Sequence, residues 1–145
     1  MRNNALLIIL SFLALLISAC STVKNTKTTN SLANAAWELE YISGPRIAFE
    51  GLYPNKKPKI TFNTTTNNVS GTSSCNGYSA KYTSNGKTIS FGEPEPTTMM
   101  FCEGGGEKEF LQMIKKVDNY SIDNDGKLNL NTGKVPMMRF KKSNN

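Results

Sequence analysis

The sequence predicts a single, mostly β domain of the α+β class, folded as a curled antiparallel sheet or cracked barrel of about seven strands with one helix. Short runs of alternating apolar and polar residues recur along the chain, separated by clusters of turn-forming residues. Apolar residues at helical spacing occur in residues 107–117. Because β–α–β alternation is missing, we expect antiparallel pairing, with the inner face of the sheet packed on the helix.

The N-terminal residues have the pattern of an exported lipoprotein. Arg2 precedes an apolar run at residues 5–17, and Ser18 and Ala19 lead to Cys20. This order is typical of a secretory signal, and the run is too short to span a bilayer as a helix. The segment ending at Cys20 is similar to the bacterial lipobox, so we expect a signal peptide at residues 1–19 and acyl chains on Cys20. An ordinary signal peptide with a coincidental cysteine is the alternative.

Lipidation would place the protein in the cell envelope. Two or more acyl chains on Cys20 hold a protein firmly in a membrane. Ser21, at the position after the lipidated cysteine, favours the outer membrane, facing the periplasm, under the enterobacterial rule. Residues 20–35, rich in Ser, Thr, Asn and Lys, are expected to be a flexible tether between lipid and domain. The domain itself is expected at residues 36–141, followed by a tail at 142–145.

The expected strands follow the alternation. In residues 36–42 the apolar face consists of Trp37, Leu39 and Tyr41. Asn85-Gly86 predicts a hairpin with a type I′ turn, since both central positions of that turn need a positive φ. The other strands are expected at residues 58–62, 69–72, 78–82, 88–91, 120–122, 128–130 and 137–140.

Three connections have distinct characters. Residues 46–57 contain apolar side chains without periodicity and are expected to form a loop over one end of the barrel. Residues 93–96, Glu-Pro-Glu-Pro, are expected to be a crossing loop because proline cannot donate to a ladder. The helix at residues 107–117 has acidic residues near its start and Lys115 and Lys116 at its end, as the helix dipole prefers.

Composition excludes several classes of site. The chain contains no histidine, which excludes Ser-His-Asp and Cys-His catalysis and histidine-ligated metals. Its net charge of +6 comes from lysines placed singly or in pairs, a pattern that indicates a solvated surface and no nucleic-acid partner.

Cys75 and Cys102, besides Cys20, are the remaining cysteines of the chain. In an exported protein a disulfide between them is the leading interpretation. Closing a loop of this size would stabilise the domain by about 3–4 kcal/mol. A redox pair or a reactive thiol is the alternative, although the chain offers neither a Cys-x-x-Cys motif nor a histidine to lower a thiol pKa.

The other candidate ligands have simpler interpretations, so we predict no catalytic residue, no metal site and no cofactor. Methionines could serve a soft metal such as Cu(I), but more often fill gaps in a core. Asp123, Asp125 and Gly126 lack the order and the distal Glu of a calcium loop and predict a turn. Residues 104–106, three glycines, predict a flexible helix entry. No two glutamates are marked as a catalytic pair among Glu38, Glu40, Glu93, Glu95 and Glu103.

Motifs spread over residues 36–141 resemble the META domain, or HslJ-like, family. The most specific are Cys75-Asn76-Gly77-Tyr78 and the Thr98-x-Met100-x-Cys102 pattern. Ser74 and Met99 depart from the family's usual glycine and basic residue. The supporting matches are Trp37-Glu38-Leu39, Ile60-Thr61-Phe62, Val69-Ser70-Gly71, Glu109-Phe110-Leu111 and Arg139-Phe140.

The resemblance implies an envelope or secreted protein with a compact, β-rich, cracked-barrel fold and no established enzymatic activity. In enterobacteria the family is linked to heat shock and novobiocin tolerance. We therefore expect a non-enzymatic lipoprotein, anchored through Cys20, with a stress-associated ligand-binding or structural role and a small ligand or envelope protein as partner. The alternatives are a protein inhibitor or assembly partner that uses residues 93–96 or 47–53 as its contact patch and, less favoured, a thiol-redox enzyme.

Overall fold

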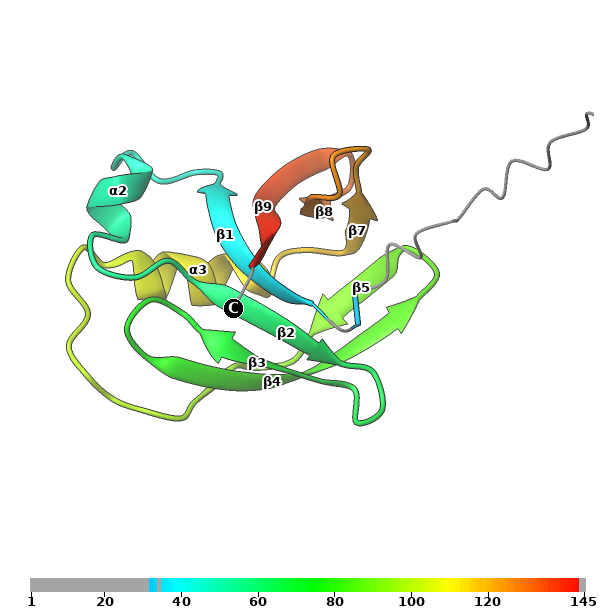
Figure 1. Ribbon diagram of the computed structural model, residues 1–145, viewed down its shortest axis with the longest axis horizontal. Coiled ribbons are helices and arrows are strands. Elements are labelled where there is room, and N and C mark those ends of the chain that lie inside the picture. Colours follow the sequence, from blue (N-terminus) through cyan, green and yellow to red (C-terminus); the bar gives the residue numbers. More distant parts are fainter. Residues whose placement is uncertain (1–31, 34, 144–145) are drawn as a thin grey trace, which may run out of the picture.

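The computed structural model describes residues 32–33 and 35–143 (Figure 1). The predicted signal peptide, Cys20 and most of the predicted tether lie outside the described residues. Within the described part, no helix combines the length and the apolar character that crossing a bilayer requires.

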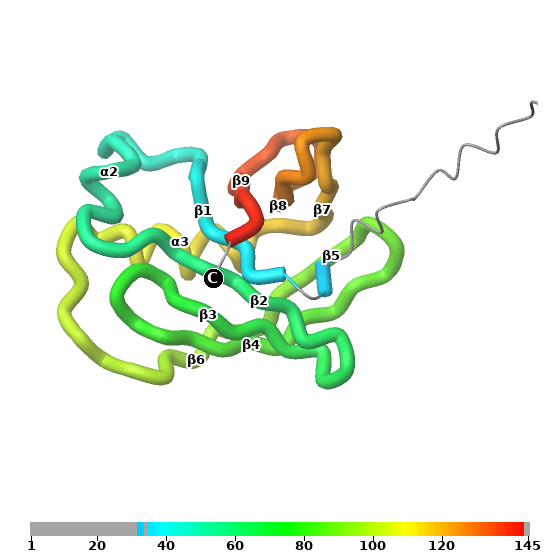
Figure 2. Tube along the Cα trace, in the orientation of Figure 1, coloured from blue at the N-terminus to red at the C-terminus, as the bar shows by residue number. Residues whose placement is uncertain are grey.

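Eight antiparallel strands close into a barrel in the order β3-β2-β1-β9-β8-β7-β5-β4, with β4 pairing back to β3. A ninth, two-residue strand, β6 (Glu95–Pro96), adds to β4 outside this ring (Figure 2). The barrel strands are β1 (Ala36–Ile42), β2 (Lys59–Asn63), β3 (Asn68–Thr72), β4 (Gly77–Asn85), β5 (Thr88–Phe91), β7 (Asn119–Ile122), β8 (Leu128–Thr132) and β9 (Val135–Ser143).

The mostly β, antiparallel prediction is confirmed, but three of its details are wrong, one of them the single expected helix, because the described residues contain two. The ring is closed and not cracked, and it has eight strands where about seven were expected. Its narrowest join lies between β5 and β7, where Thr88 and Asn119 form the single ladder pair. Two backbone hydrogen bonds, Ile89 N to Asp118 O at 3.0 Å and Tyr120 N to Lys87 O at 2.9 Å, complete this join.

The barrel interior is filled by apolar side chains. Trp37, Leu39, Ile60 and Phe140 are fully buried there. Tyr41, predicted to share their face, is instead exposed, while Ile42 is buried. A register shift between Leu39 and Tyr41 in the β1–β9 ladder explains the difference, because a β-bulge reverses the alternation beyond it.

The hairpin between β4 and β5 is confirmed, but its turn is not the predicted one. Asn85 pairs with Thr88, so Gly86 and Lys87 form the two-residue loop. Gly86 has a φ of +59°, whereas neither Asn85 nor Lys87 is among the residues with positive φ. The loop therefore requires one left-handed residue and not the two of a type I′ turn.

The part of the chain that the structure describes contains two helices. α2 (Phe49–Leu52) is a single turn within the expected loop at residues 46–57, which contributes the buried Leu52 and Tyr53 to the core. α3 (Gly106–Ile114) starts one residue before the predicted helix and ends three residues earlier. The two regions are joined by a hydrogen bond of 3.0 Å from the Tyr53 hydroxyl to Gly106 O.

Packing extends beyond the expected domain limits at both ends. Leu32 is buried in the core and accepts a hydrogen bond at its carbonyl from Trp37 Nε1. Ala33 forms a bridge with Phe62. At the other end β9 reaches Ser143, so the predicted tail at 142–145 starts within a strand.

Candidate functional site

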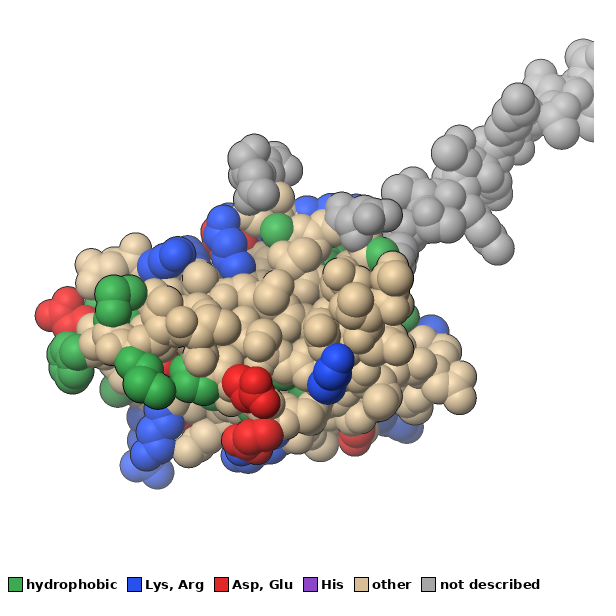
Figure 3. All heavy atoms as spheres, turned by 90° about the horizontal axis from the view of Figure 1, so that it is seen from below, with side chains coloured by type: hydrophobic (Ala, Val, Ile, Leu, Met, Phe, Trp, Pro, Cys, Tyr) green, Lys and Arg blue, Asp and Glu red, His purple; other side chains and the backbone are tan. Residues whose placement is uncertain are grey.

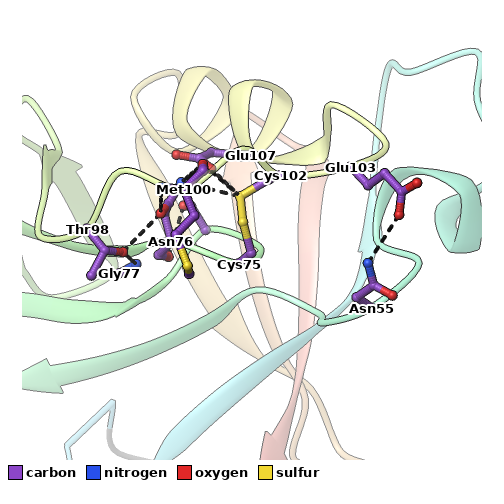
Figure 4. Close-up of a disulfide and its surroundings, with 10 residues drawn as sticks. Asn55, Cys75, Asn76, Gly77, Thr98, Met100, Cys102, Glu103 and Glu107 are labelled. Carbon is purple, nitrogen blue, oxygen red and sulfur yellow. Dashed lines mark hydrogen bonds between the residues drawn. A yellow bond between two sulfur atoms is a disulfide. The ribbon is translucent and has the colours of Figure 1, made fainter.

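A disulfide joins the turn that follows β3 to the segment that precedes α3. Cys75 and Cys102 are bonded, with their Cα atoms 5.6 Å apart, within the ordinary range for a cystine. Both residues are half-buried. Two predicted motifs 27 residues apart in sequence therefore meet in space (Figure 4).

Asn76, next to the disulfide, fastens the same segment through its side chain. Its Nδ2 donates to Met100 O and to Glu107 Oε2, both at 2.8 Å. Its Oδ1 accepts from Met100 N at 2.7 Å and from the Thr98 hydroxyl at 3.0 Å. The carboxamide thus satisfies two donors and two acceptors, and exchanging its O and N atoms would break both bonds to Met100.

Thr98 and Gly77 complete this arrangement. The Thr98 hydroxyl accepts a hydrogen bond of 3.0 Å from Gly77 N, so it links the start of β4 to Asn76. A Cβ at Gly77 would collide with the Thr97 hydroxyl, so a larger residue here would require the Thr97 side chain to move. The motif around Asn76 and the motif around Thr98 are therefore two halves of one polar clamp.

Glu107 also belongs to this cluster, although the sequence motifs do not include it. Its Oε2 lies 2.7 Å from Cys102 Sγ. A disulfide sulfur carries no hydrogen, so this is a close contact and not a hydrogen bond. The Sγ atoms of Cys75 and Cys102 and a carboxylate oxygen of Glu107 lie within 4.8 Å of one another, a grouping that reduction would convert into potential metal ligands.

The remaining motif residues have structural positions. Trp37 is in the barrel core, and Tyr78 packs edge-on against Phe110 with ring centroids 5.4 Å apart. The Tyr78 hydroxyl is buried without a hydrogen-bond partner among the described residues, and burial raises its pKa. Gly71 allows β2 and β3 to approach, because a Cβ there would collide with Lys59 O.

A groove of about 730 Å³ lies between the segment at residues 93–102 and α3. One wall contains prolines and methionines, and the other is the outer face of the helix. An ion pair of 2.9 Å between Glu93 and Lys115 connects the two walls. The lining residues are Asn76, Glu93, Pro94, Pro96, Thr98, Met99, Met100, Phe101, Cys102, Gly105, Glu107, Lys108, Leu111, Gln112 and Lys115.

The rim of the groove is an exposed apolar segment, Met99-Met100-Phe101. The exposed fractions of Met99 and Phe101 are 88% and 92%. Ile47, before α2, is also exposed. Figure 3 shows apolar side chains gathered at one end of the described surface, the end at which Figure 1 places α2 and the segment before α3.

The other predicted candidates are not brought together here. Met113 and Met138 are buried in the core, whereas Met99 and Met100 are at the surface. These four methionines therefore do not form one cluster that could bind a soft metal. Asp123 Oδ1 accepts hydrogen bonds from the backbone N–H groups of Asp125 and Lys127, which confirms the predicted turn. The pKa of Asp123 is lowered, and the largest cause is the hydrogen bond that its carboxylate accepts from Lys127 N.

These features define a small, closed β-barrel domain whose helix-proximal loop is fixed by a disulfide and an asparagine clamp. The META domain family matches residues 30–145, and the chain belongs to this family. A search of curated proteins gave no match. An NMR structure of a protein from Burkholderia xenovorans is similar to this chain in fold, with a TM-score of 0.59 and 22% identity over 79% of this chain and 85% of that one.

Proposed function

We propose that the protein is a non-enzymatic envelope lipoprotein whose META domain binds an apolar ligand in the groove beside α3. The observation that supports this is the coincidence of the groove with the exposed Met99-Met100-Phe101 segment. Exposed apolar side chains beside a concavity are typical of binding sites. The groove volume of about 730 Å³ suits a ligand of small-molecule size.

The barrel interior is a poor alternative to this groove. Its inward positions are occupied by large side chains such as Trp37, Phe140 and Leu130, all fully buried. A lipid or other ligand held inside the sheet would have to displace this core. The proposal therefore assigns ligand binding to the outside of the barrel.

Native mass spectrometry of the full chain purified from its own host membranes tests ligand binding. We expect a bound species that is lost in the double variant Met99→Ser/Phe101→Ser. The double variant Tyr41→Ser/Val135→Ser is the matched control, since those two side chains are also exposed but do not line the groove. Equal binding by both double variants, or an unliganded wild-type protein, would contradict the proposal.

An assembly partner in the envelope is the second candidate, favoured by the near-complete exposure of Met99 and Phe101. Crosslinking in intact cells from position 99 should capture a defined protein if this candidate is right. The same crosslinker at position 135 should not.

Incorporation of labelled palmitate, abolished by Cys20→Ala, tests the proposed anchor separately.

A thiol-redox function is the third candidate and is the least supported. It requires a disulfide that cycles between oxidised and reduced forms. Alkylation of the native protein before and after reduction measures the free thiol at Cys75 and Cys102. A fully unreactive pair in cells would remove this candidate.

A further inference from the structure

The Cys75–Cys102 disulfide has a carboxylate beside it that bracing the fold does not require. Glu107 Oε2 lies 2.7 Å from Cys102 Sγ, although a disulfide sulfur cannot donate to it. The three groups, two sulfurs and one carboxylate, come from the turn after β3, the segment before α3 and the first turn of α3 (Figure 4).

We propose that, when the disulfide is reduced, Cys75, Cys102 and Glu107 form a Zn²⁺ site. A dithiol reductant would supply two electrons and two protons, and would itself become a disulfide, leaving two thiols on the protein. Zn²⁺ would then replace the two thiol protons, which pass to the solvent. The product has two thiolates and one carboxylate oxygen as ligands, with a fourth position for water.

The geometry suits a tetrahedral zinc ion. Zinc–sulfur bonds of about 2.3 Å place two thiolate ligands about 3.8 Å apart. The Cα atoms of the two cysteines are 5.6 Å apart, and the three ligand atoms already lie within 4.8 Å of one another. Rotation of the two cysteine side chains is enough to separate the sulfurs, and no ligand has to be brought in from another part of the fold.

Asn76 already occupies the position of a supporting residue for such a site. Its Nδ2 donates to Glu107 Oε2 at 2.8 Å and lies 3.3 Å from Cys102 Sγ. Hydrogen bonds from neighbouring groups orient metal ligands and strengthen binding. Since Asn76 is also held by the backbone of Met100, its amide stays in place when the sulfurs separate.

The sulfurs are reachable by both a reductant and an ion. Cys102 lines the groove beside α3, and it also lines a second, smaller pocket together with Cys75. Lys108, in the groove wall, is the nearest cation in sequence to Glu107. Glu107 accepts a hydrogen bond from Asn76, and none of the ion pairs among the described residues includes it. Its negative charge is therefore available to bind a metal ion.

Titration of the full chain with Co²⁺, a spectroscopic substitute for zinc, tests the proposal. The protein is reduced with a phosphine and desalted without oxygen. We expect one Co²⁺ per reduced chain, with a thiolate charge-transfer band and the intense visible bands of a tetrahedral site, displaced by one Zn²⁺. The oxidised protein should show none of these bands.

Two carboxylate variants separate a ligand from a bystander. Glu107→Gln should weaken Co²⁺ binding by more than about 10-fold, because removing a direct ligand should cost at least as much as the roughly 10- to 100-fold typical of outer-shell partners. Glu103→Gln is the matched control, because Glu103 adjoins Cys102 in sequence but contacts Asn55 instead. Equal effects of the two variants, or unchanged affinity in Glu107→Gln, would overturn the assignment.

Stability measurements exclude binding by an unfolded chain. Zn²⁺ should raise the unfolding temperature of the reduced protein and leave that of the oxidised protein unchanged, since only the reduced native state has the site. If the reduced chain is unfolded, Zn²⁺ should restore the native fluorescence of Trp37. Failure of Zn²⁺ to do either would overturn the proposal.

Discussion

Replacement of Asn76 by aspartate probes the clamp that holds the segment before α3. The variant keeps the shape of the side chain and the acceptor for Met100 N and Thr98. It loses the amide donor and leaves a second carboxylate 2.8 Å from the nearer Glu107 oxygen. Met100 O, 2.8 Å from the former donor, also loses its partner.

The expected cost follows from these contacts. A lost hydrogen bond to a neutral group contributes about 1 kcal/mol, and one to a charged group about 1.5–3 kcal/mol. Repulsion between two partly buried carboxylates adds to both. We expect Asn76→Asp to lower the free energy of unfolding by about 3–5 kcal/mol at neutral pH.

The pH dependence distinguishes this mechanism from a general loss of packing. A proton shared between the two carboxyl groups removes the repulsion and restores a donor, and it binds more tightly in the folded than in the unfolded state. The deficit of Asn76→Asp should therefore shrink as the pH falls from 7 towards 5, because the state that binds more protons is stabilised by acid. Asn76→Ala should show a deficit that does not change over this range.

Urea unfolding followed by fluorescence of Trp37, the single tryptophan and a fully buried one, measures these free energies. Asn55→Asp is the matched control, since Asn55 Nδ2 donates to Glu103 at 3.3 Å on the exposed surface. It should cost less than about 1 kcal/mol. A deficit for Asn76→Asp that is equally small, or that stays constant with pH, would refute the reasoning.

Four further predictions concern the framework. Replacing Cys75 and Cys102 together by alanine should lower the free energy of unfolding by about 3–4 kcal/mol in calorimetry, and no change would mean that the unfolded chain is already compact. Tyr78→Phe should change the free energy of unfolding by less than about 0.5 kcal/mol or increase it, because the Tyr78 hydroxyl has no partner among the described residues. A loss above about 1 kcal/mol in urea unfolding would show that this hydroxyl does form a hydrogen bond. Gly71→Ala should cost about 3 kcal/mol in the same assay, because the added Cβ forces β2 and β3 apart. Gly105→Ala is the control: its Cβ would meet open space, so only its positive φ should contribute, at about 1–2 kcal/mol. By NMR, Asp123 should titrate below its usual pKa. Its contribution to stability is therefore present above the unfolded-state pKa and is lost as the pH falls through the folded-state value. Asp123→Asn should flatten the dependence of the unfolding free energy on pH below about pH 4.

Periodicity was sufficient to locate the eight barrel strands, because inward and outward positions alternate along most of their length. β1 and β5 have the predicted bounds, and in the strand expected at residues 78–82 the alternate residues Tyr78, Ala80 and Tyr82 are all buried. The bulge at the middle of β1 escaped prediction since nothing in the local sequence marks it. Pairing of Glu95 and Pro96 with β4 also escaped, because proline suggests a loop although it can occupy an edge strand.

The sequence motifs include most residues of the candidate site, but the disulfide is the one contact among them that the sequence predicted. Two cysteines in a chain with a predicted export signal indicate a disulfide, but the positions of Asn76 and Thr98 follow from the register between β4 and the segment beyond β6. Glu107 was interpreted as a helix-start charge, which it also is. The spacing from Cys102 to Glu107 across three glycines was the available signal, and only the folded loop shows that it brings the carboxylate onto the sulfur.

The single-pair join between β5 and β7 has a consequence for how this domain can diversify. The chain leaves the ring after β5 and returns at β7, so the excursion at residues 92–118 carries the prolines, the apolar rim and α3. The buried Phe110 and Ile114 and the Cys75–Cys102 disulfide hold this excursion on the barrel, so only its exposed side chains can change without disturbing the eight strand junctions. Stability therefore depends on the buried part of the excursion, whereas its exposed rim at Met99 and Phe101 is open to substitution.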